Sequence, residues 1–182
     1  MVVALFRCDS SFEIGSGHVY RSRSLARTLA SRGIDIVFIC RPQPGDLISL
    51  LRSEFEVWLL PPLHPNDTDD DSFRSSSSTN LNDKNSWLGC SQITDAHQTL
   101  DLIRLNSPAN PQWLVVDHYG IDTVWESLII DSMKNELNYS YFRLAVIDDL
   151  MNRFHASDLL LDQNITRYFQ SNPYEEYVPP YC

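Results

Sequence analysis

Residues 2–30, VVALFRCDSSFEIGSGHVYRSRSLARTLA, predict a strand, a glycine turn and a helix in immediate succession. Val2–Cys8 is an almost unbroken apolar run, which is typical of a strand buried on both faces of a parallel sheet. After the Gly15-Ser16-Gly17 turn, Leu25 and Leu29 stand four residues apart and define one stripe of a helix. Gly33 lies where the end of that helix is expected.

The rest of the chain repeats this alternation of apolar runs and helical patterns. Strands are expected over Ile34–Cys40, Glu56–Leu60, Trp113–Val116 and Phe142–Ile147, and helices over Gly45–Ser53, Ile93–Leu105 and Asp122–Leu137, before a last apolar run at Leu159-Leu160-Leu161. This order predicts an α/β fold, a Rossmann-like parallel sheet with crossover helices on both faces. Ligands bind such sheets outside the carboxyl ends of the strands, so polar clusters that follow strands are the functional candidates.

One segment breaks the pattern. Residues 64–86, HPNDTDDDSFRSSSSTNLNDKNS, have almost no apolar content and no periodicity. Such a composition cannot offset the entropy of ordering, so we expect a polar mobile loop.

The composition limits the classes of function. A chain of 182 residues with 43% hydrophobic residues fits one domain, with room for a trailing piece of a second. The net charge of −10 disfavours nucleic-acid binding, and the longest apolar run falls short of the roughly 20 residues that cross a membrane. Met1–Arg7 lacks the features of a signal peptide, and Cys8, Cys40, Cys90 and Cys182 show no regular spacing. We expect reduced thiols in a cytoplasmic protein.

The first polar cluster follows the first predicted strand and contains Asp9, Gly15, Gly17 and His18. The glycines let the backbone turn tightly and bring N–H groups close to a ligand. His18 falls in the first helical turn, where the helix N-terminus favours the neutral imidazole that a general base needs. A glycine turn with a histidine of no function is the alternative. A dinucleotide site is disfavoured because Tyr20 stands where a third small residue is needed, and no Gly-Lys-Ser or Gly-Lys-Thr follows to make a P-loop.

Two further clusters follow later strands. Asp117-His118-Tyr119-Gly120 places polar groups at a strand end, which is costly unless they are used or satisfied, and Asp122 fits a helix N-cap. Asp148-Asp149, with Arg153, His155 and Asp158, fits a metal site. Asp149, Arg153 and Asp158 fit equally well a network of charges that braces a loop. Without a regular ligand spacing the charge network is favoured, and we expect no bound metal and no cofactor.

Together the clusters resemble one family. The segments that carry the resemblance are Arg7-Cys8-Asp9-Ser10, Ile14–Val19, Trp87-Leu88-Gly89, Val116–Gly120 with Trp125-Glu126, and Ile147-Asp148-Asp149 followed by Arg153, His155 and Leu161–Asn164. They occur in the order found in the UDP-2,4-diacetamido-2,4,6-trideoxy-β-L-altropyranose hydrolases of pseudaminic-acid biosynthesis. This family is also labelled spore-coat polysaccharide biosynthesis protein G. The family is similar in architecture to the two-domain glycosyltransferases of the lipid II-forming type.

The resemblance implies a division of labour. Residues 1–165 would form the catalytic, sugar-side domain, and residues 166–182 would lead toward a C-terminal UDP-binding domain that this chain lacks. His18 would activate water for metal-free, inverting cleavage of the C1–O bond, with Tyr119 beside the sugar. We assign Asp9, Gly15, Gly17 and His118 to substrate binding; Asp9 is expected either to orient His18 or to bind a sugar hydroxyl.

Two other functions remain compatible with the sequence. A glycosyltransferase of the same architecture would use a carbohydrate acceptor in place of water. A non-catalytic domain would bind a sugar or a partner chain without turnover.

Overall fold

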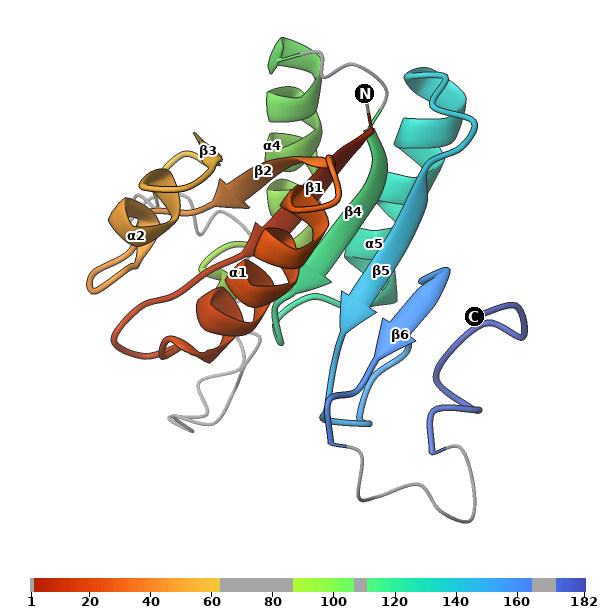
Figure 1. Ribbon diagram of the computed structural model, residues 1–182. Helices are drawn as coiled ribbons and strands as arrows, with labels where there is room; N and C mark the ends of the chain where they lie inside the picture. The colour runs from red at the N-terminus through yellow and green to blue at the C-terminus, as the bar shows by residue number, and fades with distance from the viewer. Residues whose placement is uncertain (1, 63–86, 107–110, 165–172) are drawn as a thin grey trace.

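The structure is a computed structural model that describes residues 2–62, 87–106, 111–164 and 173–182. The loop expected over residues 64–86 lies outside the described residues. Six parallel strands form one sheet in the order β3-β2-β1-β4-β5-β6 (Figure 1). Their bounds are β1 Val3–Cys8, β2 Asp35–Cys40, β3 Glu56–Leu59, β4 Pro111–Asp117, β5 Arg143–Ile147 and β6 Leu159–Leu161. The predicted Rossmann-like α/β fold is therefore confirmed.

Helices lie on both faces of the sheet, as expected (Figure 1). One face carries α1 (Gly17–Ala30) and α2 (Ile48–Arg52), and the other carries α4 (Gln92–Asn106) and α5 (Thr123–Asp131). Asp122 caps α5, since its side chain accepts a hydrogen bond from the N–H of Val124 at 2.8 Å. The helix expected as far as Leu137 changes after Asp131 into the π-helical turn η2 (Ser132–Glu136). Asn138 then takes a left-handed backbone conformation, with a φ of 59°, that turns the chain toward β5.

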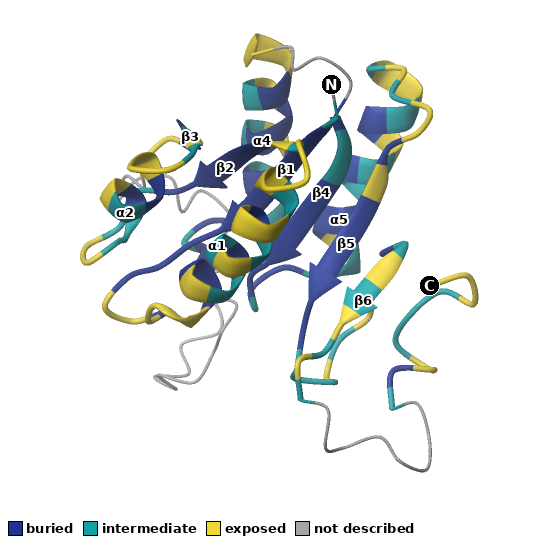
Figure 2. Ribbon diagram, in the orientation of Figure 1, coloured by how far each residue is buried: buried dark blue, intermediate teal, exposed yellow. Residues whose placement is uncertain are grey.

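The core has two layers, one on each side of the sheet, because β1, β2, β4 and β5 are buried on both faces (Figure 2). Alternate residues of a strand point to opposite faces, so Leu5 and Leu114 pack toward α4 and α5. Phe6 packs toward α1, where it stacks on Phe38 with ring centroids 5.0 Å apart. The near-continuous apolar runs of the sequence are explained by this double burial.

The edge strand β6 and the last described residues complete the domain. The Leu159–Leu161 run pairs in parallel with β5, but Leu159 and Leu161 remain about half exposed (Figure 2). Tyr174 is buried, and its hydroxyl donates to the carbonyl of Asp148 at 2.8 Å. Residues 173–182 thus pack against the sheet domain; that they lead toward a second domain stays a prediction.

The sheet brings the three polar clusters to one edge. All strands are parallel, and β1, β4 and β5 lie next to one another, with Cys8 at the end of β1 paired in register with Asp117 at the end of β4. The residues that follow Cys8, Asp117 and Ile147 therefore emerge side by side at the carboxyl edge. In the part of the chain that the structure describes, no helix has the length and apolarity to span a membrane.

Candidate active site

The loop between β1 and α1 is held by hydrogen bonds to Ser11 and sets the position of His18 at the carboxyl edge. The hydroxyl of Ser11 accepts hydrogen bonds from the N–H groups of Glu13 and Ile14 at 3.1 and 3.0 Å. Gly15 has a φ of +80°, a conformation that glycine adopts without strain, and its N–H donates to the carbonyl of Ser11. The chain then enters α1 at Gly17, so that His18 is the second helical residue, as the sequence predicts.

His18 makes a close contact with Asp117 at the end of β4. The Nδ1 atom of His18 lies 2.5 Å from Oδ1 of Asp117, and both side chains are almost fully buried. Two residues 99 positions apart in sequence are thus joined by the adjacency of β1 and β4. Asp117, rather than Asp9, lies beside His18.

The carboxylate of Asp117 accepts four hydrogen bonds from described residues, including the one from His18. Arg21, one turn after His18 on α1, donates from Nε to Oδ2 at 2.7 Å and from Nη2 to Oδ1 at 2.5 Å. The hydroxyl of Ser22 donates to Oδ2 at 3.0 Å. Burial disfavours the carboxylate, but hydrogen bonds and charge from His18 and Arg21 outweigh it and lower the pKa of Asp117. Asp117 is therefore a fixed anion.

The contact with an ionised carboxylate decides which nitrogen of His18 carries the proton. A carboxylate only accepts hydrogen bonds, so Nδ1 at 2.5 Å must be the donor. In the neutral ring the lone pair is then on Nε2. The described residues supply no hydrogen-bond partner for this atom. The arrangement is that of a general base whose orientation is fixed by a carboxylate.

His118 lies beneath His18 with a different partner. Its Nδ1 accepts a hydrogen bond from the N–H of Gly120 at 3.0 Å, which leaves the proton on Nε2. Nε2 faces Oδ2 of Asp9 at 3.6 Å. Burial is the main cause that lowers the pKa of His118 to about 4, with a further contribution from the charge of Arg7. His118 is thus a neutral, buried ring.

Asp9 belongs to a buried group of charges beneath the site. Its Oδ1 lies 2.6 Å from Nη1 of Arg7 and accepts the N–H of Arg41 at 2.7 Å. Asp95 at the start of α4 binds both guanidinium groups, at 2.7 Å in each case, and also accepts from the indole of Trp125. Two arginines and two aspartates cancel in charge, which is what burial of such groups requires. We call Arg7, Asp9, Arg41 and Asp95 the buried quartet.

An aromatic wall stands beside His18. The ring of Tyr119 lies edge-on to His18 with centroids 4.5 Å apart, and the ring of Trp87 lies 6.1 Å from Tyr119. The Tyr119 hydroxyl donates to Asp149 at 2.5 Å. Burial and this hydrogen bond raise the pKa of Tyr119 to about 12, so the phenol keeps its proton. The guanidinium of Arg21 lies over the ring, 5.4 Å from its centroid.

The third polar cluster forms a network of charges, but not among the predicted members, since Arg153 pairs with Asp148 and Asp158 with Arg143. Asp148 pairs with Arg153 at 2.7 Å, and its Oδ2 accepts the N–H groups of Leu150 and Met151. His155 pairs through Nδ1 with Glu126 of α5 at 2.7 Å. This network ties the chain after β5 to α5, and from it Asp149 reaches into the site through Tyr119.

The site residues proposed from the sequence all lie near the carboxyl edge of the sheet, but at different depths. His18 and Tyr119 line the site, while Asp9 and His118 are buried below it, with 1% and 2% of their surface exposed. Gly15 and Gly17 lie in the exposed turn, and a side-chain carbon added at either position would meet no described atom within 4 Å. Both glycines therefore leave open space at the start of α1.

Several residues of this group are not identified by the sequence pattern. The sequence pattern does not single out Arg21, and it places Asp149 in the third polar cluster and not beside Tyr119, while Asp117 and Trp87 enter only as parts of motifs. One signal was present in the sequence, because Arg21 stands three residues after His18, on the same helix face.

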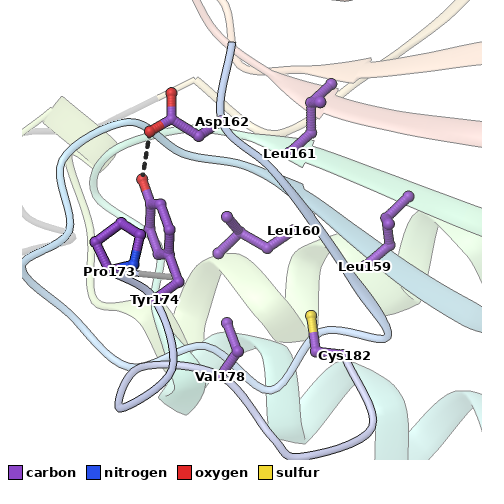
Figure 3. Close-up of a pocket in the computed structure, with 8 residues that line it drawn as sticks. All are labelled: Leu159, Leu160, Leu161, Asp162, Pro173, Tyr174, Val178 and Cys182. Carbon is purple, nitrogen blue, oxygen red and sulfur yellow. Dashed lines mark hydrogen bonds between the residues drawn. The ribbon is translucent and has the colours of Figure 1, made fainter. Parts of the chain in front are cut away.

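The pocket drawn in Figure 3 is separate from this group. It has a volume of about 340 Å³ and lies between β6 and the C-terminal segment, with Tyr174, Val178 and Cys182 on one side. Its acidic residue, Asp162, accepts a hydrogen bond from the Tyr174 hydroxyl at 3.2 Å. The pocket contains neither the histidines nor the arginines described above, so the candidate active site is the carboxyl edge around His18.

Comparison with known proteins gives one informative match. No model of a protein family matches the chain. The chain is 29% identical over 178 residues to the UDP-2,4-diacetamido-2,4,6-trideoxy-beta-L-altropyranose hydrolase of Campylobacter jejuni subsp. jejuni serotype O:2. The match covers 98% of this chain and 47% of the relative, so the chain spans about half the length of the curated protein that it matches.

The alignment extends over nearly the whole chain, including the carboxyl edge where the three clusters meet. The resemblance of this chain to a UDP-diacetamido-trideoxy-altropyranose hydrolase, which the motifs predict, is therefore confirmed, and the 47% coverage is consistent with a match to one domain of that protein.

Proposed function

We propose that this chain supplies the catalytic half of an enzyme that hydrolyses a UDP-activated diacetamido-trideoxy sugar at the anomeric C1–O bond, releasing UDP and the free sugar. The observation that carries the proposal is the pair of His18 and Asp117, with Nδ1 and Oδ1 2.5 Å apart and Nε2 left available. The relative's name supplies the substrate class.

In the proposed reaction, Nε2 of His18 takes a proton from water as the water oxygen attacks C1 of the sugar. The bond between C1 and the phosphate oxygen breaks, and its electron pair leaves with UDP. Asp117 stabilises the imidazolium that forms and keeps the ring in orientation. UDP is a good leaving group, so the site must chiefly position one water and remove its proton. The family resemblance predicts inversion at C1.

The neighbours of His18 suit a sugar substrate. Tyr119 and Trp87 present aromatic surface beside the imidazole, and the apolar faces of sugar rings pack on such surfaces. Ser16 at the N-cap of α1 makes no capping hydrogen bond to a described residue through its side chain. The first N–H groups of the helix and the open turn at Gly15 and Gly17 are therefore available to a phosphate oxygen. Asp9 and His118 support His18 from below.

The organisation of the whole enzyme is part of the proposal. The Campylobacter relative is about twice as long as the aligned segment, since the match covers 47% of it. We infer that residues 1–165 act as the sugar-side domain and that most contacts to UDP come from a second domain. Binding energy from the UDP moiety is used to orient the sugar for attack, so residues 1–182 alone are expected to have negligible turnover.

The test is a coupled assay of UDP release with the diacetamido-trideoxy sugar nucleotide. Residues 1–182 are assayed alone and fused, after Cys182, to the second half of the Campylobacter relative. The fused protein is expected to release UDP, and His18→Ala is expected to abolish release while calorimetric titration shows UDP binding nearly unchanged. His97→Ala, at an exposed histidine of α4, is the matched control and should keep full activity. An active His18→Ala fusion would remove His18 from the mechanism.

A further inference from the structure

Arg21 and His18 share one carboxylate. Oδ1 of Asp117 accepts from Nδ1 of His18 and from Nη2 of Arg21, each at 2.5 Å. The second oxygen accepts from Nε of Arg21 at 2.7 Å, so the guanidinium binds Asp117 through two parallel hydrogen bonds. Nη2 of Arg21 also lies only 3.1 Å from Nδ1 of His18. The three side chains form one compact group, with Arg21 16% and Asp117 1% exposed.

A carboxylate with no balancing charge works against a histidine base that it contacts. An anion in contact with an imidazole favours the imidazolium, by about one to three pH units for a close opposite charge. The imidazolium has protons on both nitrogens and no lone pair, so it cannot take a proton from water. In a group this buried, water screens the interaction weakly. A second charge is needed to offset the carboxylate.

Arg21 provides that charge. We propose that Arg21 is a positioning residue that neutralises Asp117, so that Asp117 orients the His18 ring without an unbalanced negative charge beside it. The inference rests on the proposed role of His18 as the base, and it names the group that keeps the base in working form. Arg21 also disfavours the imidazolium directly, because its cationic Nη2 faces the same nitrogen.

The other groups around His18 do not replace Arg21. The stacked ring of His118, 6.2 Å away, is neutral because its pKa is lowered to about 4. Tyr119 keeps its proton, since its pKa is raised to about 12. The remaining charges lie behind these two rings: Asp9 with Arg7 beneath His118, and Asp149 with Arg153 beside Tyr119. Asp117 and Arg21 are thus the charges in direct contact with the imidazole among the described residues.

The proposal predicts how His18 titrates. Residues 1–182, labelled at histidine, are titrated by NMR between pH 4 and 9, with the His18 signal assigned from a His18→Asn variant. Arg21→Gln is expected to raise the midpoint of the His18 titration by about one pH unit, a roughly tenfold change in proton affinity. Arg21→Lys keeps the charge and should restore most of the parent midpoint. Arg23→Gln is the matched control, since Arg23 pairs with Glu54 on the outer side of α1, and should change nothing.

Circular dichroism shows whether Arg21→Gln folds. If it does not, a second pair of variants tests the proposal. Asp117→Asn leaves Arg21 unopposed beside His18 and should lower the midpoint. The double variant Asp117→Asn/Arg21→Gln should return it toward the parent value. Equal midpoints in parent, Arg21→Gln and Arg21→Lys, or no effect of Asp117→Asn, would overturn the role of Arg21. The titration needs no turnover, so failure of the proposed hydrolase activity would leave this result readable by itself.

Discussion

The rings of His18 and His118 stack with centroids 6.2 Å apart and planes 18° apart, but their protons lie on opposite nitrogens. Nδ1 of His18 donates to Asp117, whereas Nδ1 of His118 accepts from the N–H of Gly120. In its neutral form the His18 ring therefore has its lone pair on Nε2, away from Asp117, whereas His118 directs its Nε2 proton toward Asp9. Two stacked histidines thus have different chemistry.

The first prediction concerns Asp117. Asp117→Asn replaces the anion that accepts from Nδ1 with an amide that can donate, which favours the wrong tautomer of His18. Turnover in the fused protein should fall by about 10³- to 10⁴-fold, as in other dyads that lose the carboxylate. Steady-state UDP release measures it. Asp101→Asn, at an exposed position of α4, is the control. A loss of less than about tenfold would mean that the carboxylate does not orient the base.

The second prediction concerns Asp95 of the buried quartet. Asp95→Asn leaves the guanidinium groups of Arg7 and Arg41, both buried, without their shared anion. Charge and hydrogen bonds from these arginines outweigh burial and hold the pKa of Asp95 well below its usual range. Removing one partner of a buried ion pair costs about 3–5 kcal/mol, so the free energy of unfolding in urea should fall by that amount.

The exposed pair on the same helix gives the comparison for Asp95. Asp101 contacts Arg104 at 3.0 Å but is largely exposed, and surface ion pairs contribute about 0–1 kcal/mol. Asp101→Asn should thus leave the unfolding curve nearly unchanged. Equal effects of Asp95→Asn and Asp101→Asn would show that the buried quartet is not what holds α4 to the sheet.

The fold was predictable because its signals are local. Five of the six strands are apolar runs long enough to be recognised, and the helices between them show their own period. Leu159–Leu161 was identified only as an apolar run, because three residues carry too little pattern to distinguish a strand from a turn. The π-helical turn after Asp131 also has no local signal that separates it from the preceding helix.

The site was predictable to the level of the sheet edge and no further. Parallel topology brings His18, His118 and Tyr119 together without any knowledge of side chains. The sequence leaves the partner of His18 open, because Asp9 and Asp117 both follow strands, and only the register of β1 against β4 and the direction of each side chain separate them. Asp95 escaped notice because a carboxylate in the first turn of a helix is usually solvated or near the N-cap, whereas here it is fully buried.

The third prediction concerns the thiols, all four of which are free. Cys8, Cys40 and Cys90 are buried, and burial raises the pKa of Cys90 to about 11, so its reactive thiolate is rare at neutral pH. Cys182 is exposed. Labelling of the native protein with a maleimide should modify one thiol rapidly and the others on the order of 100-fold more slowly, when the fold opens. Mass spectrometry identifies the site; fast labelling of Cys8 or Cys40 would contradict the buried core.

The last prediction concerns His155, which lies between two carboxylates. Its Nδ1 is 2.7 Å from Glu126 and its Nε2 is 3.8 Å from Asp148. Burial by itself lowers the pKa of His155, but Asp148 and Glu126 outweigh burial, so the pKa lies above its ordinary value. Asp148 behaves in the opposite way, because the neighbouring His155 and the charge of Arg153 outweigh burial and hold its pKa at about 2. Below this raised pKa, an imidazolium lies between the two carboxylates in the folded state.

These shifts fix the pH range in which the bridge stabilises the fold. A raised histidine pKa adds stability that is complete below about pH 6.5, the value of an unfolded histidine, and is lost as pH rises through the folded value. A lowered aspartate pKa adds stability above about pH 3.9 that is lost as pH falls toward 2. The free energy of unfolding in urea, measured from pH 5 to 9, should thus decline above about pH 6.5, and His155→Gln should remove that decline. His97→Gln, at an exposed histidine, should keep it, because no carboxylate pair is lost. A His155→Gln curve parallel to that of the parent would show that His155 does not bind its extra proton in the folded state.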